Sequence, residues 1–155
     1  MNFLDHENKI SSVIKEKLKA CGGSAAVSPM QKGKAGFEIA FTDVGIKTDK
    51  LPNYILEWGH FDRIIKKANS LGGKMYRGDQ LAQHPGNALG YEIPHDCIEG
   101  FVASELLGVE DGKSITRCST YYSGVLEWAG IATRHPAVRC VEPSFITVNE
   151  KYRDI

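Results

Sequence analysis

Two pairs of glycines divide the first half of the chain, and each pair follows a segment with helical periodicity. In residues 5–20 and again in residues 54–71, apolar side chains recur at three- and four-residue intervals, which predicts two amphipathic helices. Gly22-Gly23 ends the first segment and Gly72-Gly73 ends the second, because glycine commonly terminates a helix. The apolar stripes are Ile10, Val13, Ile14 and Leu18, then Trp58, Phe61, Ile64, Ile65, Ala68 and Leu71.

The segment between these helices has the pattern of β-strands. Residues 36–42 alternate apolar with polar or small side chains, which is typical of a half-buried strand. Residues 25–30 are expected to form the partner strand, and residues 31–35 are expected to form the hairpin loop that joins the two strands. A third short strand is expected within residues 43–47. Residues 1–78 therefore predict an N-terminal helix–β-hairpin–helix unit of an α+β fold.

Residues 74–95 are the least regular part of the sequence. Glycine or proline at positions 78, 85, 86, 90 and 94 interrupts any long element, so we expect a loop with one short strand. Loops of this length are either functional or mark a boundary. We assign residues 79–95 as an irregular connection to a second unit, and leave open whether it carries a site.

Residues 96–155 predict a helix, a turn, a second helix and a two-stranded ribbon. Asp96 with Glu99 three residues later forms a capping box, and the helix it begins runs to Leu107. The second helix is expected from Ser114 to Ala129, with Gly130 at its end. The ribbon strands are expected at residues 138–141 and 145–148. The second helix carries one continuous apolar stripe: Ile115, Cys118, Tyr122, Val125, Leu126 and Ala129.

This order of elements resembles the winged helix-turn-helix superfamily. The resemblance depends on residues 121–131, where a leucine, an acidic residue and a small residue precede Gly130-Ile131, and it covers the last third of the chain. It implies a recognition helix followed by a wing over residues 132–149. The turn at residues 109–113 is longer than the usual connection between the two helices, which is a departure from that pattern.

The resemblance implies contacts with duplex DNA, because such a helix lies in the major groove and carries polar side chains near its N-terminus. The candidate helix contacts are Lys113, Thr116, Arg117, Ser119 and Thr120. On the wing, Arg134, His135 and Arg139 are the candidate contacts to the backbone. The function expected first is therefore a small non-enzymatic DNA-binding or regulatory protein that acts as a homodimer.

Composition favours a different function with the same fold. Lys plus Arg and Asp plus Glu each number 19 in 155 residues, whereas phosphate contacts normally leave a basic excess. A protein-interaction or adaptor module without nucleic acid is therefore the alternative, and a small hydrolase or nuclease ranks last. The chain shows no apolar run of membrane length, and its first residues are too charged for an export signal, so we expect a cytoplasmic protein without a membrane partner.

Several motifs suggest chemistry but have simpler explanations. Residues 108–114 are like a phosphate-binding loop, but their glycines are one residue too close. The scattered cysteines Cys21, Cys97, Cys118 and Cys140 fit free thiols, so no metal and no cofactor is expected. Adjacent His95, Asp96 and Cys97 cannot form a catalytic triad among themselves. A basic cluster is expected to be a solvated surface: Arg63, Lys66, Lys67, Lys74 and Arg77.

Overall fold

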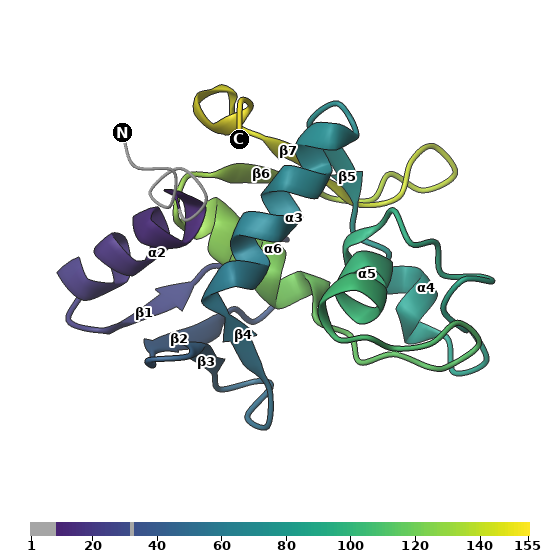
Figure 1. Ribbon diagram of the computed structural model, residues 1–155, viewed down its shortest axis with the longest axis horizontal. Helices are drawn as coiled ribbons and strands as arrows, with labels where there is room; N and C mark the ends of the chain where they lie inside the picture. The colour runs from purple at the N-terminus through teal and green to yellow at the C-terminus, as the bar shows by residue number, and fades with distance from the viewer. Residues whose placement is uncertain (1–8, 32) are drawn as a thin grey trace.

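The computed structural model describes residues 9–31 and 33–155, and it confirms an α+β fold. Two antiparallel sheets lie on either side of two central helices, α3 (Trp58–Ser70) and α6 (Ser119–Trp128) (Figure 1). The residues 5–8 that we expected to begin the first helix lie outside the described residues. The described part of that helix is α2 (Lys9–Ala20), and it packs on α3 and on the first sheet.

The first sheet, sheet A, is an antiparallel meander in the order β1-β2-β3-β4. Its first two strands are the predicted hairpin and its third is the predicted short strand. The fourth strand is a correction, because the sequence predicts helix from Tyr54, whereas Ile46 pairs with Leu56 and α3 begins at Trp58. The strands are β1 (Ser24–Val27), β2 (Phe37–Phe41), β3 (Gly45–Thr48) and β4 (Ile55–Glu57).

The second sheet, sheet B, joins the two halves of the chain. β7 (Phe145–Val148) lies between β5 (Lys74–Tyr76) and β6 (Ala132–His135), in the order β5-β7-β6. The strand predicted at residues 138–141 is wrong. The amide of Val138 donates to the carbonyl of Glu142 and the amide of Glu142 donates back, which closes a tight turn instead of extending a strand.

The second helix of the C-terminal part begins five residues later than predicted. The sequence predicts a helix from Ser114, but α6 begins at Ser119, and residues 115–118 have no regular structure. The physical reason is a distant carboxylate. Glu99 accepts the backbone N–H of Cys118 at 2.9 Å and that of Ser119 at 3.1 Å, so it caps the helix there. The apolar stripe within α6 is confirmed, since Tyr122, Val125 and Leu126 are fully buried.

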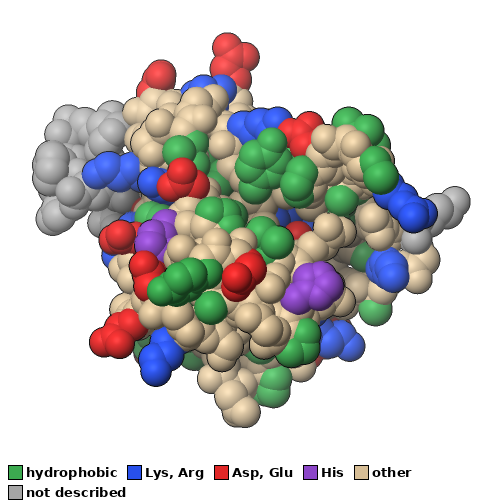
Figure 2. Space-filling model, turned by 90° about the vertical axis from the view of Figure 1, so that its right-hand side faces the viewer, with side chains coloured by type: hydrophobic (Ala, Val, Ile, Leu, Met, Phe, Trp, Pro, Cys, Tyr) green, Lys and Arg blue, Asp and Glu red, His purple; other side chains and the backbone are tan. Residues whose placement is uncertain are grey.

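The irregular segment has a small hydrophobic cluster of its own. Leu89 and Ile93 pack with Cys97 and Ala103 beside α4 (Asp79–Gln83), α5 (Ile98–Phe101) and the π-helical segment η1 (Val102–Leu106). Figure 2 views this end of the molecule, where hydrophobic side chains lie exposed among acidic and basic ones. This end therefore presents no uniformly basic surface. Cys97, not the predicted Asp96, caps α5, because its sulfur accepts the amide of Gly100.

The main hydrophobic core is continuous through the chain. It contains side chains from α2 and α3 and from α6 and β7, so residues before and after the 79–95 segment share one interior. The short 3₁₀ turn Glu150–Tyr152 closes the described chain, with Tyr152 buried against this core. Among the described residues, no helix combines the length and the apolar character needed to cross a membrane.

Candidate functional site

A cleft of about 430 Å³ opens where the β1–β2 loop, α4, the segment before α6 and one end of sheet B meet. We call it the arginine cleft. Its basic lining residues are Lys34, Arg77, Arg117 and Arg134, and Asp79 is its acidic one. The other lining residues are polar or apolar: Pro29, Met30, Gln31, Ala35, Phe37, Gln80, Gln83, Thr120, Ala137 and Ser144. Its charge therefore suits an anion.

Arg77 follows β5 directly, and backbone hydrogen bonds fix it on both sides. Its N–H donates to the carbonyl of Ser144 at 3.0 Å, and its carbonyl accepts the N–H of Glu99 at 3.1 Å. Gly78, with φ of 76°, then turns the chain, and a Cβ at that position would meet the Cys97 sulfur at 2.5 Å. Arg77 is thereby held at the inner end of the cleft, with 4% of its surface exposed.

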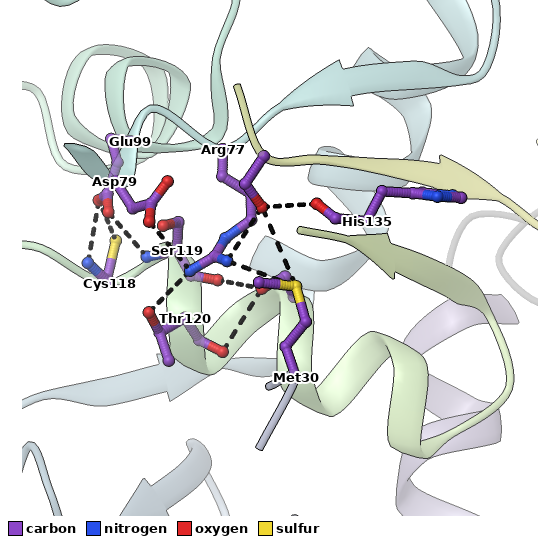
Figure 3. A network of polar contacts seen from close by, with 10 residues as sticks. Met30, Arg77, Asp79, Glu99, Cys118, Ser119, Thr120 and His135 are labelled. Carbon is purple, nitrogen blue, oxygen red and sulfur yellow. Dashed lines mark hydrogen bonds and ion pairs between the residues drawn. The ribbon is translucent and has the colours of Figure 1, made fainter. Parts of the chain in front are cut away.

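The guanidinium of Arg77 has neutral hydrogen-bond partners. Figure 3 shows it directed toward the start of α6, where it donates to the hydroxyl of Thr120 at 2.9 Å. It also donates to the hydroxyl of Ser144 at 3.2 Å and to the sulfur of Met30 at 3.8 Å. Within the described residues, the Asp79 carboxylate comes to 3.7 Å, which is an ion pair without a hydrogen bond, and the Nε has no partner. A buried cation is thus left without a bonded counter-charge.

Burial and neighbouring charges act on Arg77 in opposite directions. Desolvation lowers the pKa of its guanidinium, and the positive charges of Arg134 and Arg117 lower it further. The carboxylates of Asp79 and Glu99 raise it. A guanidinium keeps its proton at neutral pH even so, because its ordinary pKa is far above that range. The cleft therefore holds a permanent positive charge whose stabilisation is incomplete.

Arg134 lies on β6 in the same cleft, and its charge is compensated. Its Nε and one terminal nitrogen donate to the Glu127 carboxylate at 3.1 and 2.9 Å, and that nitrogen also donates to the carbonyl of Ser28 at 2.9 Å. The other Glu127 oxygen accepts the backbone N–H of Arg134 at 2.7 Å. These two guanidinium nitrogens thus donate to one oxygen of Glu127, and such charge-assisted hydrogen bonds are stronger than neutral ones. Arg134 thus holds β6 against the end of α6.

The structure brings three of the predicted site residues together. Arg117, Thr120 and Arg134 all line the arginine cleft, although they come from the segment before α6, from α6 and from β6. Ser119, next to Thr120, is fully buried, and its hydroxyl has no partner among the described residues. Part of the predicted set of DNA contacts therefore lies together, around Arg77, which the sequence analysis had assigned to a solvated basic cluster.

The other predicted residues lie outside this cleft. Lys113 and Thr116 are exposed on the irregular segment before α6, and Arg139 lines an adjoining cavity. His135 contributes its carbonyl, which accepts the Ser144 hydroxyl at 2.7 Å, while its ring points away from the network (Figure 3) and stacks on Phe145. These four residues therefore do not line the arginine cleft.

The position of α6 corrects the expected recognition helix. None of its ten residues is exposed, because it packs between β6 and β1. A helix that enters a major groove needs a side facing solvent. Four α6 residues are half-buried and the others are buried, so this helix exposes little surface, and Lys113, Thr116 and Arg117 precede it instead of lying on it. The contact with DNA itself stays a prediction.

Sequence reasoning missed the central residue of the site. We expected Arg77 to belong to a solvated basic cluster, whereas Arg77 is buried. Its partners Thr120 and Ser144 are 43 and 67 residues away in the chain, so local sequence carries no signal for the contact. The glycine after it is the one local sign, because it marks a sharp turn at the end of β5.

Other reactive groups lie in the core. The Tyr122 hydroxyl is 2.8 Å from the His60 Nδ1 and 2.9 Å from the Tyr54 hydroxyl, and burial lowers the pKa of His60. Burial raises the pKa of Cys97 to about 11 and raises that of Cys118 as well, so both thiols stay protonated and unreactive at neutral pH. The described residues include no group of three or more His, Cys, Asp or Glu side chains placed to hold a metal ion.

Comparison with protein-family models, curated proteins and solved structures finds no match for this chain.

Proposed function

We propose that this protein is a non-enzymatic binding protein that takes up an anionic group in the arginine cleft. One observation carries the proposal: Arg77 is 4% exposed, yet its hydrogen bonds go to two hydroxyls and a thioether instead of a carboxylate. Burying a charge without a bonded counter-charge is costly. An anion that enters the cleft would supply a counter-charge hydrogen-bonded to Arg77, which Asp79 at 3.7 Å does not.

Phosphoryl and carboxylate groups suit this cleft best. A guanidinium offers parallel N–H donors that match two oxygens of either group. Arg117 is exposed at the cleft and brings a second cation, and Lys34 a third. The hydroxyl of Thr120 accepts from Arg77 and can donate its own proton to a bound oxygen, whereas the Ser144 hydroxyl already donates to the carbonyl of His135. The volume of about 430 Å³ lies in the range of small-molecule sites.

Thermal unfolding with added anions tests this function. Phosphate at ten times its Kd stabilises the folded protein by about 1.4 kcal/mol, which raises the Tm by about 4 °C. Chloride at the same ionic strength is the reference, and sulfate and citrate are the further probes. If all of them shift the Tm equally, the cleft binds no anion and Arg77 is only structural.

A pair of arginine variants locates the effect. Arg117→Gln removes a cation at the cleft, whereas Arg63→Gln removes an exposed cation from α3, outside the cleft lining. We expect Arg117→Gln to raise the phosphate Kd about tenfold, the value of one charge-assisted hydrogen bond. Arg63→Gln should leave it unchanged. Equal losses in both variants would indicate diffuse surface charge instead of a site.

Duplex DNA is the second candidate ligand, because four of the predicted contacts are exposed and polar: Lys113, Thr116, Arg117 and Arg139. In this form of the function they contact backbone phosphates, and α6 reads no bases. Anisotropy of labelled random duplexes at 50 and 200 mM salt tests it, since phosphate contacts weaken steeply with salt.

Homodimer formation and a cytoplasmic location, both expected from the sequence, stay predictions. Sedimentation of the purified protein tests homodimer formation.

A further inference from the structure

A second cavity of about 620 Å³ adjoins the arginine cleft. The two share the lining residues Gln31, Gln80 and Ala137, so they form one continuous groove. The second cavity is walled by the turn after β6, residues 137–143. An occupant longer than a single anionic group therefore has a path from the arginines to this turn.

The turn presents apolar side chains to solvent. Val138 is 54% exposed and Val141 is 77% exposed, which places them among the most exposed large hydrophobic residues of the described chain. The hydrogen bonds between Val138 and Glu142 hold the turn closed, and Cys140 between them has a φ of 63°. That backbone conformation is disfavoured for a residue other than glycine, and such strain clusters at functional sites. The valines are thus held in a defined shape beside the cleft.

The junction of the two cavities is lined by amides. Gln31 and Gln80 lie at the junction, and Gln83 lies in the arginine cleft beside it. A glutamine side chain both donates and accepts hydrogen bonds, as a peptide group does. These side chains therefore complement the backbone of an extended peptide better than they complement a purely apolar ligand.

Charge selects the kind of peptide. Arg139 adds a cation to Lys34, Arg77 and Arg117, whereas the charge of Arg134 is compensated by Glu127; the acidic lining residues are Asp79 and Glu142. Glu142 is already paired with Lys74. The groove as a whole is consequently positive, and it attracts an acidic segment.

We propose that this groove binds a peptide segment of a partner protein, with an acidic side chain in the arginine cleft and an adjacent apolar side chain against Val138 and Val141. The inference depends on the proposed anion-binding function and specifies its ligand. The acidic group supplies the counter-charge for Arg77, the glutamines bond to the peptide backbone, and the valines bury apolar surface.

Fluorescence anisotropy with three labelled octapeptide pools tests the inference. All pools are amidated at the C-terminus, so that the acidic side chain alone supplies the carboxylate. The first pool has Glu followed by Val, Leu or Ile, the second replaces Glu with Gln, and the third replaces the apolar residue with Ser. We expect the first pool to bind the full chain with a submillimolar Kd and the other two to bind about tenfold more weakly. Equal binding of all pools, or no binding at 1 mM, overturns the proposal.

Protein variants separate this inference from the function on which it depends. Val138→Ser combined with Val141→Ser should weaken the first pool about tenfold, while the Tm shift caused by phosphate stays. Val44→Ser, a change at another exposed valine, should leave both unchanged. If phosphate protects the protein but the first pool does not bind, the peptide inference fails alone. If phosphate does not raise the Tm of the protein and the first pool does not bind, the anion-binding function fails together with the peptide inference.

Discussion

Arg134 and Arg77 are two buried arginines in one cleft, and they are stabilised in different ways. Arg134 is 9% exposed and donates two hydrogen bonds to one oxygen of the Glu127 carboxylate, whereas Arg77 is 4% exposed and donates to hydroxyls and a sulfur. Arg77 directly follows β5, and Arg134 lies within β6, so both are positioned by sheet B. Arg134 thus completes its charge balance within the fold, while in the proposed function Arg77 completes it with a ligand.

The largest effect is expected from removing the counter-charge of Arg134. Glu127→Gln leaves a buried guanidinium without its carboxylate, so the free energy of unfolding should fall by about 2 kcal/mol; partial exposure of Glu127 keeps this below the cost of a fully buried pair. Urea denaturation measures it. Asp79→Asn is the matched control at Arg77, and there the loss should stay under about 1 kcal/mol, because no hydrogen bond is broken. Equal losses would abolish the distinction between the two arginines.

A smaller effect on stability is expected when Arg77 itself is replaced. Arg77→Met removes a poorly compensated charge and fills its space, so the free energy of unfolding should change by no more than about 1 kcal/mol. Protection by phosphate should be lost at the same time. Arg134→Met, which breaks the ion pair with Glu127, should lower the free energy of unfolding by about 2 kcal/mol. An Arg77→Met protein that is still stabilised by phosphate would contradict the role of Arg77 in binding.

The smallest effect on stability is expected at an ion pair on the surface. It tests whether an ion pair contributes to stability only when it is buried. Lys74 and Glu142 form an ion pair at the surface of sheet B. Exposed pairs contribute little, because water and salt screen them. Lys74→Gln should accordingly leave the urea midpoint and the phosphate Kd unchanged. A clear loss of either would show that the expected cost of breaking the Arg134–Glu127 pair does not depend on its burial.

The sequence predicts the parts of the fold that local patterns determine. The periodicity of residues 9–20 and 58–70 gives the helices, the alternation around Ile39 gives β2, and Phe145 to Val148 gives β7. The end of α6 at Gly130 also follows from sequence, because glycine at that position closes a helix. These features depend on neighbours a few residues apart.

Long-range contacts determine what the sequence does not predict. The start of α6 is set by Glu99, which is 19 residues before Cys118. The burial of Arg77 depends on residues from three other segments. The charged residues next to Arg77 in the sequence therefore do not predict it. Of the candidate site, sequence reasoning reached Arg117, Thr120 and Arg134, but through a helix expected to begin at Ser114 that in fact begins at Ser119.

The wide separation in sequence of the partners of Arg77 has a kinetic consequence. Met30, Thr120 and Ser144 are 47, 43 and 67 residues from Arg77, so the cleft cannot exist until several large loops have closed. The anion site therefore belongs to the completed chain and not to an early folding nucleus. In stopped-flow measurements, phosphate should leave the refolding rate nearly unchanged and slow the unfolding rate, because contacts absent from the transition state act on unfolding. A ligand of this cleft would thus lengthen the lifetime of the native protein without hastening its formation.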